Sequence, residues 1–205
     1  VEACAREAHI FLLRRETLFG CIAPACLHGE ARVARGNRLA QAFCFRVLRA
    51  WNTANTYGAR YREHPEAFKD TLRGEIEEGF RLTGPDVAKA EAAHTQLWRG
   101  FQAFLEKYEY FVLPVTQLPP FDINTPYPTE IAGVKFDNYI DWMKSCWYIS
   151  ATANPAASVP AGFTPEGLPV GLQIVGRDKA DFSVLQLAHA FEQATAFGKR
   201  RPQIA

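Results

Sequence analysis

Hydrophobic periodicity divides the first half of the chain into three predicted helices. Between residues 38 and 57, apolar side chains recur at three- and four-residue steps, the period of one helix face. A second helix is expected over 65–84, because Pro65 is favoured in a first helical turn and a Gly-Pro pair ends the segment. A third is expected over 86–108, with Asp86 as its N-terminal cap.

The pattern changes to short apolar runs in the second half. Residues 110–113 form an apolar run rich in aromatic and β-branched residues that is followed by Pro114, which favours a buried strand. Five prolines then interrupt residues 114–128, and their missing amide donors exclude a helix or a ladder. The segment is therefore expected to be a long, stiff loop, which either lines a pocket or forms a solvated connection.

A helix and two strands are predicted after this loop. The helix is expected to run from Asp137, as its cap, to about Ser150, with apolar and small polar residues on one face. Apolar runs at 156–160 and 168–176 flank the turn residues 164–167. The chain should therefore form a strand, a tight turn and a second strand.

A last helix is expected to begin at its cap, Asp181, and to end before Gly198. Five residues form its predicted apolar side: Phe182, Leu185, Ala188, His189 and Phe191. A histidine on such a face is usually a core residue, so His189 is expected to be buried. Helices interleaved with apolar strands indicate an α/β layer structure.

Composition and charge exclude several classes of function. The 205 residues are 48% hydrophobic and 22% charged, which suits one globular core, and the net charge of +1 provides no field for nucleic acid or an anionic membrane. No apolar run approaches the roughly 18 residues of a membrane span, and the first residues are not a signal peptide, so a cytoplasmic protein is expected. Cys21, Cys26 and His28 lack a fourth ligand at zinc-site spacing, so no metal is expected. The glycine spacing does not fit a phosphate-binding loop, and no cofactor is expected.

No catalytic nucleophile is identified among the serines. Four are present: Ser145, Ser150, Ser158 and Ser183. None stands in a Gly-x-Ser-x-Gly elbow or a Ser-x-x-Lys arrangement. Lys144 adjoins Ser145, but adjacent helical residues point about 100° apart. Ser158 alternates with apolar neighbours on a predicted strand, so its hydroxyl is expected to bond a neighbouring backbone group.

Three stretches near the end of the chain closely resemble the end of amidase-signature enzymes. They are NPAASVPAGF at 154–163, GLPVGLQIVG at 167–176 and AHAFEQA at 188–194. The resemblance extends to 110–120 and, more weakly, to the helices from about residue 43. Residues 43–205 are therefore expected to be the C-terminal part of an amidase-like α/β domain. Residues 1–42, where a helix and a strand are expected, form an atypical segment that follows no family pattern.

The resemblance implies a partial amidase fold with a mixed β-sheet flanked by helices. It also implies hydrolysis of a carbon–nitrogen amide bond by a Ser-Ser-Lys triad, with backbone amides holding the oxyanion. In that family the triad lies in a Gly/Ser-rich signature of the amino-terminal half, and this sequence has no such loop. The expected function is therefore a part of an amidase that supplies sheet and pocket wall, carries no catalytic residue and is inactive alone.

The resemblance also places the proline-rich loop and the helix before Asn154 around the variable group of the substrate. Five residues are thereby candidates for substrate binding: Thr116, Trp142, Cys146, Ser150 and Asn154. Ordinary core or loop packing is the alternative for each of them. Asp141 could orient a substrate amine, although an exposed helix carboxylate is the commoner case.

Two other functions stay open. The chain could be a non-catalytic truncated module that binds a partner, or a second copy as a homo-oligomer, through an exposed sheet edge and apolar patch. A protein of the transamidase-subunit type, which feeds ammonia to a tRNA-linked substrate, shares the family. The partner expected for the complete protein is a small-molecule amide.

Overall fold

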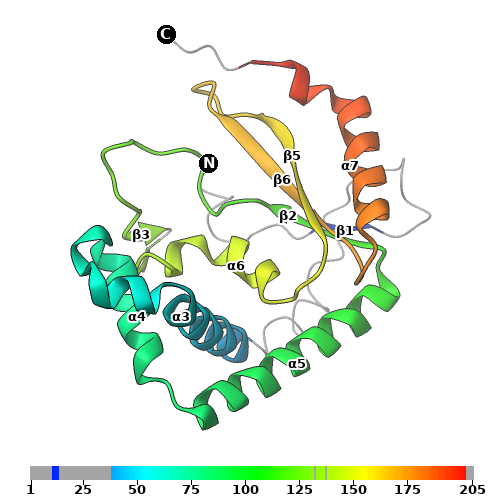
Figure 1. Ribbon diagram of the computed structural model, residues 1–205. Coiled ribbons are helices and arrows are strands. Elements are labelled where there is room, and N and C mark those ends of the chain that lie inside the picture. Colours follow the sequence, from blue (N-terminus) through cyan, green and yellow to red (C-terminus); the bar gives the residue numbers. More distant parts are fainter. Residues whose placement is uncertain (1–10, 14–37, 132, 137, 202–205) are drawn as a thin grey trace. The chain divides into compact units, whose positions relative to one another are not determined.

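The computed structural model describes residues 11–13, 38–131, 133–136 and 138–201 (Figure 1). The chain forms two compact units, one of residues 30–100 and one that combines residues 1–29 with 101–205. Most of the atypical segment 1–42, including Cys21, Cys26 and His28, lies outside the described residues. Within it, the structure describes the strand β1 (Phe11–Leu13) and the start of the first long helix.

The helical unit is built on α3 (Arg38–Glu63) and α4 (Asp70–Arg81). The predicted helix over 38–57 is confirmed and extends six residues further. The helix predicted over 65–84 is divided instead into a 3₁₀ turn, η3 (Pro65–Ala67), and α4. Phe68 separates the two in an extended conformation, and its buried ring packs edge-on against Tyr61 at 5.7 Å. Burial of this aromatic ring overrides local helix propensity.

Close contact between α3 and α4 depends on Gly79. A Cβ atom at this position would lie 2.1 Å from the carbonyl oxygen of Ala50 and 2.5 Å from the Cβ of Ala54. Ile76, one turn away on α4, is fully buried in the same interface. Arg49 and Glu75 form an ion pair beside it, in which Arg49 Nη2 donates to Glu75 Oε2 at 3.1 Å.

The third long helix, α5 (Gly84–Lys107), begins with a reciprocal cap. Asp86 was expected to be the cap itself, but Thr83 takes that place and Asp86 lies in the first turn. The Thr83 amide donates to Asp86 Oδ2 at 2.9 Å, and the Asp86 amide donates to Thr83 Oγ1 at 3.4 Å. These donors, with the Thr83 hydroxyl first among them, hold the pKa of the Asp86 carboxyl below its usual value.

The second unit contains a four-stranded sheet in the order β1-β2-β6-β5. Its other strands are β2 (Tyr110–Pro114), β5 (Ala156–Phe163) and β6 (Pro169–Val175). The α/β class and the strand–turn–strand prediction are confirmed. A mixed sheet was expected, whereas every pairing among the described strands is antiparallel. β5 and β6 pair antiparallel because a tight turn joins them, and such a turn can connect only antiparallel neighbours.

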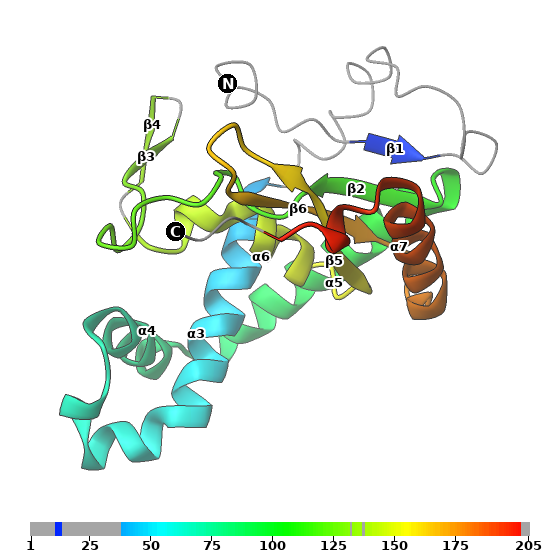
Figure 2. The same cartoon turned by 90° about the horizontal axis from the view of Figure 1, so that it is seen from above.

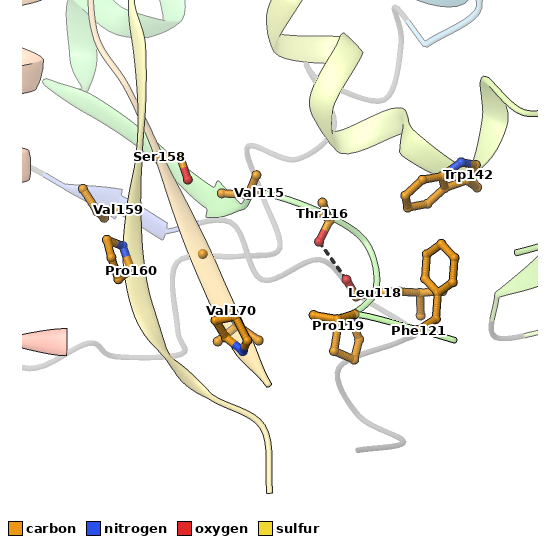
Figure 3. A pocket seen from close by; sticks show the side chains of 13 residues that line it. Val115, Thr116, Leu118, Pro119, Phe121, Trp142, Ser158, Val159, Pro160 and Val170 are labelled. Carbon is orange, nitrogen blue, oxygen red and sulfur yellow. Dashed lines mark hydrogen bonds between the residues drawn. The ribbon is translucent and has the colours of Figure 1, made fainter. Parts of the chain in front are cut away.

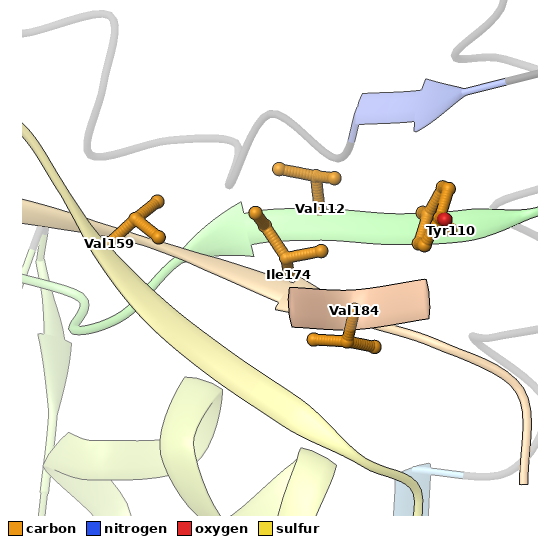
Figure 4. Packing of buried hydrophobic residues seen from close by; sticks show 5 residues of the cluster. All are labelled: Tyr110, Val112, Val159, Ile174 and Val184. Carbon is orange, nitrogen blue, oxygen red and sulfur yellow. The ribbon is translucent and has the colours of Figure 1, made fainter. Parts of the chain in front are cut away.

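The two faces of this sheet are buried against different helices (Figures 1 and 2). On one face, Val112, Val159 and Ile174 pack against Val184 of α7 (Asp181–Thr195), as Figure 4 shows. On the other face, Leu113 and Val175 pack against Ile149 of α6 (Lys144–Ser150). The unit is therefore a sheet between two helical layers, as the sequence pattern predicts.

The buried side of α7 differs from the predicted one. Val184 is buried, and Leu187, Ala188 and Phe191 pack around it, which is the i, i+3, i+4, i+7 pattern. Of the predicted apolar side, only Ala188 and Phe191 face the sheet. Phe182 and Leu185 are 73% and 60% exposed, and His189 is exposed rather than a core residue. The cap prediction is also wrong, because Ala180 rather than Asp181 stands at the N-cap of this helix.

The helix predicted from Asp137 to Ser150 is shorter than expected. It consists of a 3₁₀ turn, η4 (Asp141–Met143), that leads into α6. Asp137 lies outside the described residues. Asn138 performs a capping role instead, because its Oδ1 accepts from the amides of Ile140 at 3.0 Å and Asp141 at 3.2 Å.

Three short elements complete the described fold. The strands β3 (Glu130–Ile131) and β4 (Val134–Lys135) form a separate two-stranded ribbon, and η5 (Phe197–Lys199) follows α7. In the part of the chain that the structure describes, no helix is both long enough and apolar enough to cross a membrane.

Gly79 and Gly74 provide a matched test of the α3–α4 contact. Gly79→Ala should destabilise the chain by about 1–3 kcal/mol, because the new methyl group overlaps the α3 backbone. Gly74→Ala should stabilise it by about 0.5–1 kcal/mol, because a Cβ there meets nothing within 4 Å and alanine is the better helix former. Urea unfolding followed by far-UV circular dichroism measures both, and effects of the same sign would contradict this packing.

The Thr83–Asp86 cap predicts an acid-dependent loss of stability. The pKa of Asp86 in the folded chain is below its ordinary value. The ionised carboxylate therefore stabilises the folded state at pH values above the ordinary pKa, and this stabilisation is lost as the pH falls through the folded pKa. Thr83→Ala should lower the thermal unfolding midpoint at neutral pH, and its difference from wild type should narrow as the pH falls through the lowered pKa of Asp86. Thr95→Ala is the control, since the Thr95 hydroxyl bonds only the backbone of its own helix. If the difference in unfolding midpoint between Thr83→Ala and wild type stayed constant with pH, the Asp86 carboxylate would not be the group that stabilises this cap.

Candidate functional site

A pocket of about 550 Å³ lies in the second unit, between the proline-rich loop, η4 and the β5–β6 hairpin (Figure 3). Its wall is mostly apolar and includes four prolines: Pro119, Pro120, Pro160 and Pro169. Phe121 and Trp142 form one side, while Val115 lies next to the sheet. Gly171 of β6 also lines the pocket. A concave apolar surface with a few polar groups is the usual form of a small-molecule site.

The loop starts as a continuation of the sheet. The Val115 amide donates to the Gly171 carbonyl at 3.2 Å and so extends the β2–β6 pairing by one residue. A Cβ atom on Gly171 would lie 2.9 Å from Cγ2 of Val115, so glycine allows the Val115 side chain to lie across β6. Thr116 then turns its hydroxyl to the loop, where Oγ1 donates to the Leu118 carbonyl at 2.7 Å.

Aromatic contacts hold the loop against the segment before α6. Phe121 and Trp142 meet edge to face with ring centres 5.5 Å apart, and Tyr139 contacts Trp142 at 6.4 Å. Tyr127, further along the loop, contacts Tyr139 at 5.8 Å. Such perpendicular pairs are each worth about 0.5–1.5 kcal/mol beyond burial, so the pocket side made by Phe121 and Trp142 is well supported.

Thr116 and Trp142, two of the five predicted substrate-binding residues, line this pocket. The Trp142 ring faces Phe121, while its indole nitrogen lies on the side of the ring away from Phe121 (Figure 3). This nitrogen is buried and has no hydrogen-bond partner among the described residues. The Trp142 ring, rather than its N–H group, is therefore what the pocket presents.

Cys146 and Ser150 lie on α6 and are not part of the pocket lining. Cys146 Sγ donates to the Val115 carbonyl at 3.1 Å and so connects α6 to the start of the loop. Ser150 Oγ donates to the Cys146 carbonyl at 3.4 Å and is exposed. Cys146 thus supports the pocket wall from behind in this structure.

Asn154 also lies outside the pocket lining and joins two elements of the unit. Its Nδ2 donates to the Gly176 carbonyl at 2.8 Å, and its Oδ1 accepts from Gln102 Nε2 at 3.0 Å. These bonds link the end of β6 to the last turns of α5. Contact with substrate stays a prediction for Asn154 and for the other four candidates.

Ser158 is a pocket residue that sequence reasoning assigned a different role. Its hydroxyl was expected to bond a backbone group, but it has no hydrogen-bond partner among the described residues and it lines the pocket. Along β5, Ala156, Ser158 and Pro160 are exposed, whereas Val159 is buried. The alternation of the strand already indicated this face, since Val159 must point to the core and Ser158 away from it.

Charged groups near the pocket are paired with one another. Asp141 accepts from Asn138 Nδ2 at 3.0 Å and lies 3.7 Å from Lys144 Nζ. Its side chain is 18% exposed, whereas an exposed helix carboxylate was expected. Lys144 also lies over the ring of Phe136, 5.7 Å from its centre. Among the described residues, no group of three histidine, cysteine, aspartate or glutamate side chains is placed to hold a metal ion.

Two known proteins show what the sequence is similar to. An acylamidase from Rhodococcus erythropolis is 34% identical over 142 residues, which are 65% of this chain and 30% of that protein. A glutamyl-tRNA(Gln) amidotransferase subunit from Oceanobacillus iheyensis is 32% identical over 169 residues, which are 77% of this chain and 32% of that protein. The chain thus spans less than a third of the length of these relatives.

Solved structures share the fold. A crystal structure of an amidase, 26% identical, matches with a TM-score of 0.68 over 75% of this chain and 35% of that one. A bacterial aryl acylamidase of the amidase signature family matches in fold with a TM-score of 0.67, at 22% identity, over 80% of this chain and 35% of that one. Residues 41–185, more than half of the chain, match the family described as Amidase. The chain therefore belongs to the amidase family.

Proposed function

We propose that this chain supplies a wall of the substrate pocket, and part of the sheet, of an amidase that hydrolyses carbon–nitrogen amide bonds. The observation that carries the proposal is the apolar pocket formed by the proline-rich loop and the β5–β6 hairpin, which lies within the segment that matches the family. The substrate is a small-molecule amide, and this pocket receives its variable group.

The pocket chemistry supports binding more than bond cleavage. An activated serine needs a base within hydrogen-bond reach. Ser158 has no such partner among the described residues, and Ser183 bonds the Tyr110 hydroxyl on the opposite face of the sheet. Lys144 is paired with Asp141. We therefore propose that the nucleophile and its base are not among the described residues, and that the chain alone does not hydrolyse amides.

A transamidase component is a related candidate within the same family. It is favoured by the likeness to the glutamyl-tRNA(Gln) amidotransferase subunit of Oceanobacillus iheyensis, which extends over 77% of this chain. Such a component would work with partner proteins, whereas an amidase would bind simple amides without them. Binding of simple amides by the isolated chain therefore favours the first proposal.

The binding proposal predicts a fluorescence response to simple amides. Titration with acetanilide or hexanamide should change the tryptophan emission saturably, because Trp142 lines the pocket. The change should disappear in Trp142→Phe and persist in Trp51→Phe, which removes an exposed indole of the other unit. In the same samples, product release should stay at the level of buffer. A response that survives Trp142→Phe, or hydrolysis that a serine-directed reagent blocks, would contradict the proposal.

The second function, a non-catalytic interaction module, is favoured by the apolar side chains that α7 exposes. Phe182 and Leu185 lie one turn apart on the side of α7 that does not pack on the sheet. Large apolar residues that adjoin on a surface are typical of protein interfaces. The occupant that we propose is a second copy of this chain, which makes it a homo-oligomer.

This proposal predicts that the chain has more than its monomer mass in solution. Size-exclusion chromatography with light scattering should give a dimer or larger species, and Phe182→Ser with Leu185→Ser should return the chain to a monomer. Ile123→Ser is the control, since Ile123 is 96% exposed but lies in the proline-rich loop. A wild-type monomer at all concentrations would exclude the oligomer.

A further inference from the structure

Two polar side chains of the pocket, Ser158 and Trp142, have no hydrogen-bond partner among the described residues, and of the two Ser158 is exposed while the Trp142 indole nitrogen is buried. The Thr116 hydroxyl already donates to the Leu118 carbonyl, and the Trp142 N–H group lies on the side of its ring away from Phe121. The Ser158 hydroxyl has no partner among the described residues, and Figure 3 shows it directed toward Val115 at the base of the pocket.

The sheet fixes the direction of this hydroxyl. Ser158 lies opposite Gln173 in the β5–β6 register, while its neighbour Val159 is buried in the cluster that packs on α7. Because successive strand residues point to opposite faces, burial of Val159 holds Ser158 on the pocket face. A one-residue shift of β5 would bury the hydroxyl and expose Val159, so the orientation is strongly specified.

Gly171 keeps the space beside the hydroxyl open. A Cβ atom at Gly171 would lie 3.3 Å from Ser158 Oγ and 2.9 Å from Cγ2 of Val115. A larger residue would therefore crowd both groups at the base of the pocket. With glycine present, a ligand atom can approach the hydroxyl from the pocket side.

The rest of the pocket wall is mostly apolar, so the Ser158 hydroxyl is one of few groups that could hydrogen-bond a polar substituent of a ligand. Proline has no amide N–H, so the four wall prolines offer no backbone donor, and the side chains of Val115, Leu118 and Phe121 are apolar. A polar substituent that enters such a wall loses its bonds to water, which is unfavourable unless a protein group replaces them. Flat rings of Phe121 and Trp142 suit an aromatic group in the same space.

We propose that Ser158 is a specificity-determining residue that hydrogen-bonds a hydroxyl substituent on an aromatic ring seated in this pocket. The inference rests on the proposed pocket function and specifies its substrate class as amides that bear a hydroxylated aryl group. Ser158 acts here in recognition and has no role in cleavage of the amide bond.

The test compares benzamide with 3- and 4-hydroxybenzamide as ligands of the full 205-residue chain, with Trp142 emission as the signal. Wild type should bind one of the hydroxylated compounds about 3- to 10-fold more tightly than benzamide, the range of one neutral hydrogen bond. Ser158→Ala should bind all three compounds with equal affinity. Ser158→Thr, which keeps a hydroxyl, should retain a preference.

Ser183→Ala is the matched control, because it removes a hydroxyl from the opposite face of the sheet and should leave the preference intact. A preference that persists in Ser158→Ala overturns the assignment of Ser158 while the pocket proposal stands. Equal affinity of wild type for all three compounds also overturns it. If none of them binds to wild type, the pocket proposal itself fails.

Discussion

Burial of β6 on both of its faces is the constraint on which the sheet unit depends. Ile174 and Val175 are adjacent and point in opposite directions, yet they are only 1% and 0% exposed. Each fully buried aliphatic side chain contributes about 1.5–3 kcal/mol. Since α7 covers Ile174 and α6 lies over Val175, both helices have to be in place before this strand is fully buried.

The pocket follows from the same strand at its other end. β6 carries a large side chain at Ile174 but none at Gly171, and the Val115 side chain lies across the strand at Gly171. β6 is therefore buried in the core at Ile174 and Val175 and lines the pocket at Gly171. Cys146, through its bond to the Val115 carbonyl, connects the two, because α6 both buries Val175 and supports the start of the loop.

Much of the fold could be predicted from the sequence wherever the local signal and the tertiary structure agree. The strand at 110–113, the strand–turn–strand unit and the long helices all have strong periodicity and clear turn residues, and all are present. Predictions failed where a tertiary contact or a neighbouring cap decided the outcome. Phe68 breaks a helix for the sake of ring burial, Thr83 displaces Asp86 as the cap, and α7 buries Val184 instead of Phe182.

The site was predicted less completely for a similar reason. Family resemblance indicated the loop and the helix before Asn154, and both Thr116 and Trp142 line the pocket. Resemblance alone does not distinguish a residue that faces a cavity from one that supports its wall, as Cys146 does. The alternation along 156–160 indicated the face of Ser158, and the structure adds that this face lines the pocket.

The irregularity in β5 has a consequence for how this sheet behaves among other chains. β5 is the terminal strand of the described sheet, and its register shifts between Pro160 and Gly162. A bulge and a proline interrupt the even row of donors and acceptors that an incoming strand would have to match. Pro160, which lines the pocket, therefore also helps to make this edge of the described sheet a poor template for an incoming strand.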